Sequence, residues 1–354
     1  MTRPFEVRDD LLGVPPYRAP QVEAAVRLNT NESPWPPPDG FLKDLAERIA
    51  RLELNRYPDR EARALRRALG SRFTWPGDGV WVANGSNEII QTLLLAFGGA
   101  GRRLLIFTPT YAMYPQIAAV TATGLVSREV AEPWVLDPAA VATAVGEADP
   151  AITFICSPNN PTGTVQPLDV VRAALDANRG IVVVDEAYGE FGGEAATTIL
   201  GRHDRLAVVR SFSKSWRLAG ARLGYLLAHP WLIEAMQIAR LPYHLSTLTQ
   251  TAGEVAVRHQ QQILGQIAEI VAERDRLGKE LERVSGVEVF PSDANFLLFR
   301  TPWDGPRLWT GLADAGVLVR DFSGMIPRAL RVTVGSAEQN LTFVETLRSV
   351  LADG

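Results

Sequence analysis

Arg210-Ser-Phe-Ser-Lys-Ser-Trp-Arg-Leu-Ala-Gly-Ala-Arg222 is the most informative stretch of the sequence, because it follows a strand-like run and gathers reactive side chains in one loop. The stretch holds the hydroxyls of Ser211 and Ser213, the amine of Lys214 and a guanidinium at its end. Hydroxyls and an arginine suit a phosphate dianion, and a lysine amine can form an imine with an aldehyde. Taken alone, however, a lysine among serines is more common in a solvated loop.

Short β-rich runs surround this stretch and predict an α/β fold. They cover residues 103–107, 124–129, 152–156, 181–184 and 206–210, with helix-like segments between several of them. This rhythm favours a mainly parallel sheet flanked by helices in one large domain. One helical pattern begins near residue 41, and a second covers residues 60–73. One long helix is expected over residues 247–284. Later strand-like pieces at 287–290, 296–300 and 330–334 predict a smaller α+β domain.

Proline is dense in the first 40 residues, which predicts an extended arm there because proline interrupts helices. We therefore divide the chain into an arm with part of the small domain (1–40), a large domain that holds the lysine loop (41–250) and a small C-terminal domain (251–354).

Composition favours a small-molecule partner in the cytoplasm. The 354 residues include 36 basic and 40 acidic ones, for a formal charge of -4, and no long basic block suggests nucleic acid or an anionic membrane. A single cysteine, Cys156, allows no intrachain disulfide and no thiolate cluster for a metal. The charged N-terminus has no apolar core typical of a signal peptide, and no apolar run is long enough to span a bilayer.

Upstream of the loop, a buried-type strand ends in Asp185-Glu-Ala-Tyr188. Open α/β sheets bind ligands at the carboxyl ends of their strands. A carboxylate there can pair with the protonated nitrogen of the pyridoxal phosphate ring, which strengthens the ring as an electron sink. Asp185 is the candidate, Glu186 is the rival acid, and Tyr188 can bond the phenolic oxygen of the cofactor. The alternative interpretations are a helix N-cap at Asp185 and an ordinary buried tyrosine.

Two turns supply further parts of such a site. The turn Ser157-Pro-Asn-Asn-Pro-Thr-Gly163 follows a strand and makes Asn160 a second donor to the phenolic oxygen. The segment Asn84-Gly-Ser-Asn-Glu88 precedes an apolar helix, whose N-terminus can bind phosphate, so Gly85, Ser86 and Asn87 would complete the phosphate site. Either turn alone is a weak signal.

With these pieces in order, the sequence resembles the fold-type I pyridoxal-5′-phosphate aminotransferases and, within them, the histidinol-phosphate aminotransferase family. The matching pieces are Tyr17-Arg-Ala-Pro, Leu28-Asn-Thr-Asn-Glu-Ser-Pro34, Asn55-Arg-Tyr-Pro58, Gly85-Ser-Asn-Glu88, Thr108-Pro-Thr-Tyr111, Asn159-Asn-Pro-Thr-Gly163, Asp185-Glu-Ala-Tyr188, Ser211-Phe-Ser-Lys214, Arg222-Leu-Gly-Tyr225, Leu241-Pro-Tyr-His-Leu245, Ala294-Asn-Phe296 and Arg331-Val-Thr-Val-Gly335. They span residues 17–335, so the resemblance covers most of the chain.

The resemblance implies a role for each matching residue. Lys214 would hold the cofactor as an imine and move the substrate proton, while Asp185, Asn160 and Tyr188 would contact the cofactor ring, and Tyr111 would stack on it. Ser86, Ser211, Ser213 and Arg222 would bind its phosphate, and Tyr57 would reach that phosphate from the second subunit of a homodimer. On the substrate side, the implied residues are Tyr17, Asn295, Arg320, Arg331 and, from the partner chain, Tyr243. Arg320 as a surface ion-pair residue and Tyr243 as an interface residue are the plainer alternatives.

The function that follows is a ping-pong transfer of an amino group between histidinol phosphate and 2-oxoglutarate. The alternatives are an aromatic amino acid aminotransferase, a threonine-phosphate decarboxylase and a non-catalytic module that binds the cofactor. The sequence departs from the family pattern at Ser215-Trp216-Arg217 after the lysine and at Asn29-Thr-Asn-Glu-Ser33 with Trp35. These departures bear on substrate preference and not on the cofactor chemistry.

Overall fold

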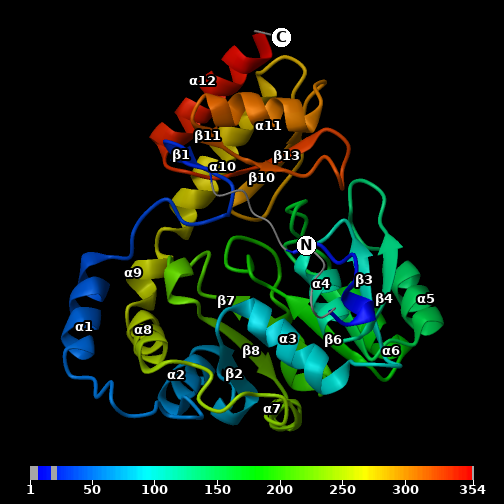
Figure 1. The fold of residues 1–354 in the computed structure, drawn as a ribbon, viewed down its shortest axis with the longest axis vertical. Helices are drawn as coiled ribbons and strands as arrows, with labels where there is room; N and C mark the ends of the chain where they lie inside the picture. The colour runs from blue at the N-terminus through cyan, green and yellow to red at the C-terminus, as the bar shows by residue number, and fades with distance from the viewer. Residues whose placement is uncertain (1–6, 17–21, 353–354) are drawn as a thin grey trace.

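The computed structural model describes residues 7–16 and 22–352. A large body surrounds a seven-stranded sheet, and a smaller body sits on the edge where several of its parallel strands end (Figure 1). The strands, in their order across the sheet, are β2 (Val80–Ala83), β8 (Gly224–Ala228), β7 (Leu206–Ser211), β6 (Ile181–Asp185), β5 (Ile152–Cys156), β3 (Arg103–Thr108) and β4 (Gly124–Glu129). Only β8 runs antiparallel to its neighbours, so the predicted α/β fold with a mainly parallel sheet is confirmed.

Helices cover both faces of this sheet. On one face, alternate residues such as Leu105, Val182 and Val208 pack against α2 (Arg63–Phe73), α5 (Pro138–Ala148), α6 (Leu168–Ala177) and α8 (Thr247–Arg258). On the other face, Ile106 and Val183 pack against α3 (Ser86–Phe97), α4 (Met113–Val120) and α7 (Pro230–Met236). Because both faces are covered, the central strands read as continuous apolar runs.

The small body is built on an antiparallel sheet in the order β12 (Arg320–Asp321), β13 (Ala329–Thr333), β10 (Phe296–Arg300) and β9 (Glu288–Val289). Its helices are α10 (Ile267–Glu282), α11 (Gly305–Asp314) and α12 (Ala337–Ala352), which share one apolar cluster with the sheet. A short pair of parallel strands, β1 (Val26–Arg27) and β11 (Val317–Leu318), brings the start of the chain into this body. That pairing agrees with our assignment of part of residues 1–40 to the small body, while the division of the chain at residues 40 and 250 stays a prediction.

The prediction of one continuous helix over residues 247–284 is wrong. The structure has three helices there, α8, α9 (Gln260–Leu264) and α10, and they lead from the large body to the small one (Figure 1). The first break is at His259, whose ring nitrogen lies 3.2 Å from the Asp44 carboxylate on α1 (Asp39–Ile49). The second is at Gly265 and Gln266, where glycine has a low helix propensity. The absence of proline was therefore too weak a basis for predicting one helix.

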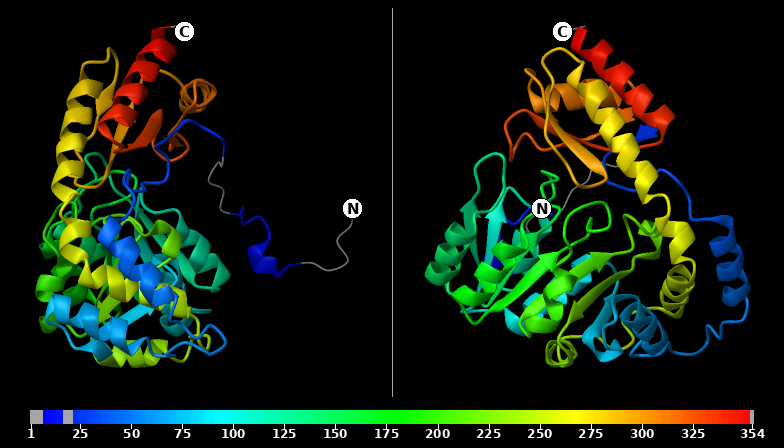
Figure 2. Two further views of the ribbon diagram at one scale, coloured as in Figure 1. Left: turned by 90° about the vertical axis from the view of Figure 1, so that its left-hand side faces the viewer. Right: turned by 180° about the vertical axis from the view of Figure 1, so that it is seen from behind.

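The N-terminal segment lies apart from both sheets. A short 3-10 helix, η1 (Asp9–Leu11), packs near α4, and Figure 2 shows this segment standing away from the body of the molecule. Among residues 7–16 and 22–38, no α-helix forms, as the prolines predicted. After this arm, the chain crosses from the small body towards α1 on the large one.

Phe299→Ala is expected to lower the free energy of unfolding by about 3–5 kcal/mol, because truncating a buried phenylalanine leaves a cavity. Phe299 is fully buried in β10, with its ring 5.8 Å from that of Phe343. The measurement is urea unfolding followed by circular dichroism. Leu341→Ala on α12 is the control, since Leu341 is 58% exposed, and its change should stay within about 0.5 kcal/mol. Equal losses in the two variants would contradict this account of the core.

Candidate active site

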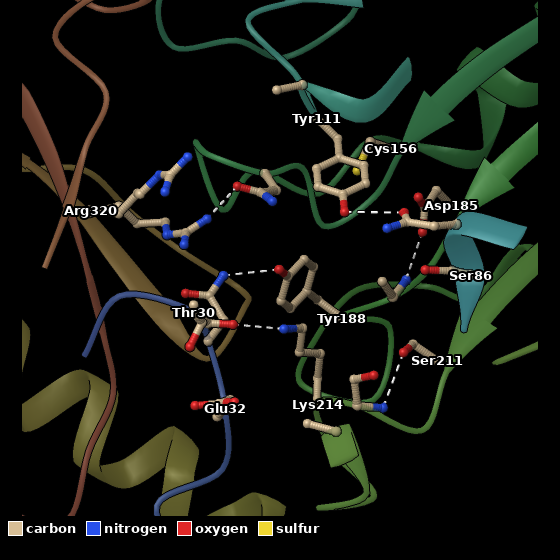
Figure 3. A pocket seen from close by; sticks show the side chains of 18 of the residues that line it. Thr30, Glu32, Ser86, Tyr111, Cys156, Asp185, Tyr188, Ser211, Lys214 and Arg320 are labelled. Carbon is tan, nitrogen blue, oxygen red and sulfur yellow. Dashed lines mark hydrogen bonds between the residues drawn. The ribbon is translucent and has the colours of Figure 1, made fainter. Parts of the chain in front are cut away.

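A cavity of about 360 Å³ lies between the carboxyl ends of the large sheet and the small body. Figure 3 shows Lys214, Asp185 and Ser211 on one side of it and Arg320 on the other. The predicted site residues that line the cavity are Ser86, Asn87, Tyr111, Asn160, Asp185, Tyr188, Ser211, Ser213, Lys214, Arg222, Arg320 and Arg331. The structure therefore brings together residues that lie up to 245 positions apart in the sequence.

Sheet geometry explains much of this convergence. Strands β5, β6 and β7 are adjacent and parallel, and they end at Cys156, Asp185 and Ser211. Strand β8 starts opposite Ser211 at Gly224, which in turn pairs with Ala83 just before α3. The N-terminus of α3 is thus held beside the loop that carries Lys214.

The phosphate side of the cavity combines hydroxyls, a helix N-terminus and an arginine. The Ser213 Oγ accepts a hydrogen bond from the Arg222 Nη1 at 3.3 Å, and the Ser211 Oγ accepts one from the Ser213 backbone N–H at 3.0 Å. Gly85 precedes α3 with a φ of +80°, and a Cβ placed there would lie 2.6 Å from the Arg222 Nη2. The positive φ favours glycine at this position, and the backbone N–H groups at the N-terminus of α3 suit an anion.

Asp185 is buried at the carboxyl end of β6, and both of its oxygens already accept a hydrogen bond. The Tyr114 hydroxyl donates to Oδ2 at 2.8 Å and the Ala187 backbone N–H donates to Oδ1 at 3.1 Å. Burial raises the pKa of Asp185, while these two donors oppose that rise. The rival acid, Glu186, faces away and forms a buried ion pair with Arg210. The geometry therefore favours Asp185 as the partner of the ring nitrogen.

Lys214 points its amine into the same cavity, where the Nζ donates to the backbone oxygen of Thr30 at 2.7 Å. Burial is the main cause that lowers the pKa of Lys214 to about 8. The positive charges of Arg331 and Arg222 lower this pKa as well, whereas Glu32 raises it. A neutral lysine amine is consequently accessible near physiological pH.

Three more predicted residues line the cavity. The Tyr188 hydroxyl accepts a hydrogen bond from the Asn31 Nδ2 at 2.9 Å, and burial raises the pKa of Tyr188 to about 12. The Tyr111 hydroxyl donates to the Asn87 Oδ1 at 3.1 Å. Asn160 accepts a 2.6 Å hydrogen bond from the Arg331 Nη1, so it connects the large body to the small one at the cavity.

Arg331 and Arg320 come from the small body. They stand opposite each other on the paired strands β12 and β13. Arg331 donates from Nη2 to the Asn29 backbone oxygen at 2.8 Å, and its guanidinium lies 5.0 Å from the ring centres of Phe296 and Phe322. Two guanidinium groups on one wall suit an anionic substrate group.

Some of the predicted residues do not line the cavity. Asn295 is fully buried and donates from Nδ2 to the Asn31 backbone oxygen at 3.1 Å, so it contacts the wall from behind. Tyr57 and Tyr243 lie on the surface, where their rings stack with centroids 4.4 Å apart. Tyr17 lies outside the described residues.

Sequence reasoning missed several groups that contact the predicted ones. Tyr114 bonds Asp185, Asn31 bonds Tyr188, and the Thr30 backbone accepts from Lys214. The available signal for Tyr114 was its position one helical turn after Tyr111, and the signal for Asn31 was its place in Leu28-Asn-Thr-Asn-Glu.

Ser215, Trp216 and Arg217, which depart from the family pattern, do not line the cavity. The Ser215 hydroxyl donates to the buried Glu190 carboxylate at 3.0 Å, and Trp216 packs on Phe212 with ring centres 4.6 Å apart. Arg217 donates from Nη1 to the Pro36 backbone oxygen at 2.8 Å. This segment therefore anchors the lysine loop and adds no bulk to the cavity.

The residues present fit pyridoxal phosphate. Hydroxyls, a helix N-terminus and Arg222 suit its phosphate, the buried Asp185 suits its ring nitrogen, and the Lys214 amine suits its aldehyde. Within the described part of the chain, no group of histidine, cysteine, aspartate and glutamate side chains could hold a metal ion, and no helix is long and apolar enough to cross a membrane.

Comparisons with known proteins agree with this chemistry. Residues 23–347 match the family model described as aminotransferase class I and II. The chain is 47% identical to histidinol-phosphate aminotransferase from Frankia casuarinae, over 98% of this chain and 90% of the relative. It is also 47% identical to the enzyme of that name from Mycolicibacterium smegmatis, over 96% and 91%. Its fold resembles that of histidinol-phosphate aminotransferase from Sinorhizobium meliloti in complex with pyridoxal-5′-phosphate, with a TM-score of 0.85 and 23% identity over 94% of this chain and 92% of that one.

The lowered pKa of Lys214 predicts how fast the apo-protein captures pyridoxal phosphate at each pH. Only the neutral amine attacks an aldehyde, so the rate constant should rise with pH and level off above a midpoint near 8, well below the ordinary lysine value of 10.5. Stopped-flow absorbance measures this rate. Arg331→Ala removes a charge that lowers this pKa, so its midpoint should move to higher pH, whereas Arg331→Lys keeps the charge. An unchanged midpoint in Arg331→Ala would contradict the electrostatic explanation.

Proposed function

The chain belongs to the aminotransferase class I and II family, and from that premise we propose that it is a pyridoxal-phosphate-dependent histidinol-phosphate aminotransferase with 2-oxoglutarate as amino acceptor. Relatives with that name match nearly the whole chain at 47% identity. The observation that carries the proposal is the position of Arg320 and Arg331, which line the same cavity as Lys214.

The two arginines explain the preference for a phosphorylated substrate. Arg320 and Arg331 project from neighbouring strands of the small body, and two guanidinium forks suit a phosphate dianion better than one. Arg331 would bind the substrate phosphate and, in the second half-reaction, the carboxylate of 2-oxoglutarate. Asn295 supports this wall through Asn31.

The large body supplies the catalytic side chains. Bound pyridoxal phosphate supplies an electron sink for the negative charge that develops at the substrate carbon. Lys214 removes and returns the proton at that carbon, which suits an amine whose pKa is lowered to about 8. With the cofactor bound, Asp185 would hold the proton on the ring nitrogen, Tyr188 and Asn160 would bind the phenolic oxygen, and Tyr111 would stack on the ring.

The phosphate of the cofactor is held by residues on two elements. Gly85, Ser86 and Asn87 form the N-terminus of α3, and Ser211, Ser213 and Arg222 come from the loop after β7 and its end. Because these groups bind a part of the cofactor that does not react, they position the reacting carbon beside Lys214.

A homodimer is part of the proposal. Tyr57 and Tyr243 form an exposed stacked pair, and nearby in the sequence Leu54, Ile238 and Leu241 are at least 66% exposed. A contiguous exposed apolar patch can mark a protein interface, and we propose that these side chains form one. Burying them against a second copy would bring Tyr57 to the cofactor phosphate and Tyr243 to the substrate of the partner.

We place the enzyme in the cytoplasm. The support is chemical: Cys156, the single cysteine, is a buried free thiol beside the reactive site, and reducing compartments preserve such thiols.

A substrate panel tests the proposed reaction. We expect kcat/KM for histidinol phosphate with 2-oxoglutarate to exceed that for phenylalanine or tyrosine. In the same panel, Arg320→Ala should lower kcat/KM for histidinol phosphate by about 10–100-fold, the effect of losing a hydrogen bond to a charged group, and should change the value for phenylalanine little. Coupled measurement of glutamate formation gives these constants.

Two outcomes of the panel would overturn the proposal. Brisk turnover of phenylalanine or tyrosine without turnover of histidinol phosphate would indicate an aromatic amino acid aminotransferase. Release of carbon dioxide from threonine phosphate would indicate a decarboxylase.

Mixing two defective variants tests the shared active site. Lys214→Ala lacks the essential amine, and Tyr57→Ala lacks the tyrosine that each subunit would donate to its partner. A hybrid dimer then holds one site with both Lys214 and Tyr57, so co-refolded variants should regain activity that neither has alone. Two Lys214→Ala preparations carried through the same treatment are the control. Absence of complementation in proven hybrids would contradict the donation of Tyr57.

A further inference from the structure

The phenol of Tyr114 lies directly behind the buried carboxylate of Asp185. Tyr114 is 1% exposed and Asp185 is 3% exposed, and the hydroxyl donates to the Asp185 Oδ2 at 2.8 Å. Tyr114 is absent from the lining of the cavity, so it stands behind the cavity wall. Its hydroxyl acts on the cavity through the lining residue that accepts its hydrogen bond, Asp185.

The position of the Tyr114 ring is defined by aromatic contacts. It stacks on Phe154 of β5, with ring centres 4.8 Å apart and planes inclined by 6°. On its other side, Tyr111 meets it edge to face at 5.5 Å. Tyr114 lies in the first turn of α4, two residues after the pocket-lining Ala112. Packing thus holds the hydroxyl at the carboxylate before any ligand arrives.

The hydrogen bond has a defined direction. Burial and the nearby Asp185 raise the pKa of Tyr114 well above that of a free tyrosine, so the phenol keeps its proton and acts as donor. The second oxygen of Asp185 accepts from the Ala187 backbone N–H. Each carboxylate oxygen thus has one donor within the protein, and both donors favour the ionised form over the protonated one.

We propose that Tyr114 is a positioning residue that holds Asp185 as an oriented carboxylate and thereby keeps the shared proton on the ring nitrogen of the cofactor. This inference rests on the proposed cofactor site. Without the hydroxyl, a buried carboxylate with one donor is a stronger base, and the proton shifts towards Asp185. The ring nitrogen then loses its positive charge, and the ring accepts less electron density from the substrate.

Tyr114→Phe isolates the hydroxyl, because phenylalanine keeps the stacking on Phe154 and the edge contact with Tyr111. We expect kcat to fall with little change in KM, and the affinity for pyridoxal phosphate to fall by about 10–100-fold, as for the loss of a hydrogen bond to a charged group. The direct readout is the nitrogen-15 NMR signal of pyridoxal phosphate labelled in its ring. In the wild type this signal should be that of a protonated nitrogen, and in Tyr114→Phe it should move towards that of the unprotonated ring.

Tyr225→Phe is the matched control, because it removes a buried phenol hydroxyl that has no hydrogen-bond partner among the described residues and leaves the packing around Tyr114 intact. Its nitrogen signal should stay at the wild-type position. A wild-type signal in Tyr114→Phe, or an equal shift in Tyr225→Phe, would overturn the role of the Tyr114 hydroxyl. A wild-type protein that neither binds pyridoxal phosphate nor transfers amino groups would instead overturn the proposed function, so the two failures are distinguishable.

Discussion

The Asp185 carboxylate lies at the carboxyl end of β6, in the middle of the seven-stranded sheet, and has almost no exposure to water. Burying an ionised carboxylate is costly unless hydrogen bonds or opposite charges compensate for the lost water. The Tyr114 hydroxyl and the Ala187 backbone N–H supply part of that compensation within the protein. In the proposed cofactor complex, the positively charged ring nitrogen would supply the rest. The same desolvation that makes Asp185 costly would then make it selective for a protonated ring.

Positive charge is concentrated on the rest of the cavity wall. Arg222, Lys214, Arg320 and Arg331 line it, and Asp185 and Glu32 are the acidic side chains among the lining residues. The proximity of Arg331 and Arg222 helps to lower the pKa of Lys214 to about 8. A cofactor phosphate beside Arg222 and a substrate phosphate beside the other two arginines would satisfy these charges. Affinity for two anions and the availability of a neutral lysine amine thus arise from the same arrangement.

One crossing segment of the chain connects the two bodies at this cavity. The Asn29 backbone accepts from Arg331 of the small body, and the Thr30 backbone accepts from Lys214 of the large body. Further along, the Pro36 backbone accepts from Arg217. Since Lys214 of the large body and Arg331 of the small body both contact this short segment, its conformation helps to set the distance between them. The departures from the family pattern at Ser215 and Arg217 therefore act on anchoring and not on cavity size.

Local sequence determined the elements and the chemistry of this protein. Apolar runs followed by Asp185, Asn160 and Lys214 predicted buried strands whose ends carry functional groups, and the resemblance to aminotransferases assigned those groups to pyridoxal phosphate. The tertiary structure alone decided which of Asp185 and Glu186 faces the cavity, because the choice depends on the buried Arg210 that pairs with Glu186. It also revealed Tyr114 behind Asp185 and the break at His259, since contacts between distant elements leave no periodic signal in the sequence. A residue that acts through another residue is recognisable only once the fold has placed the two in contact.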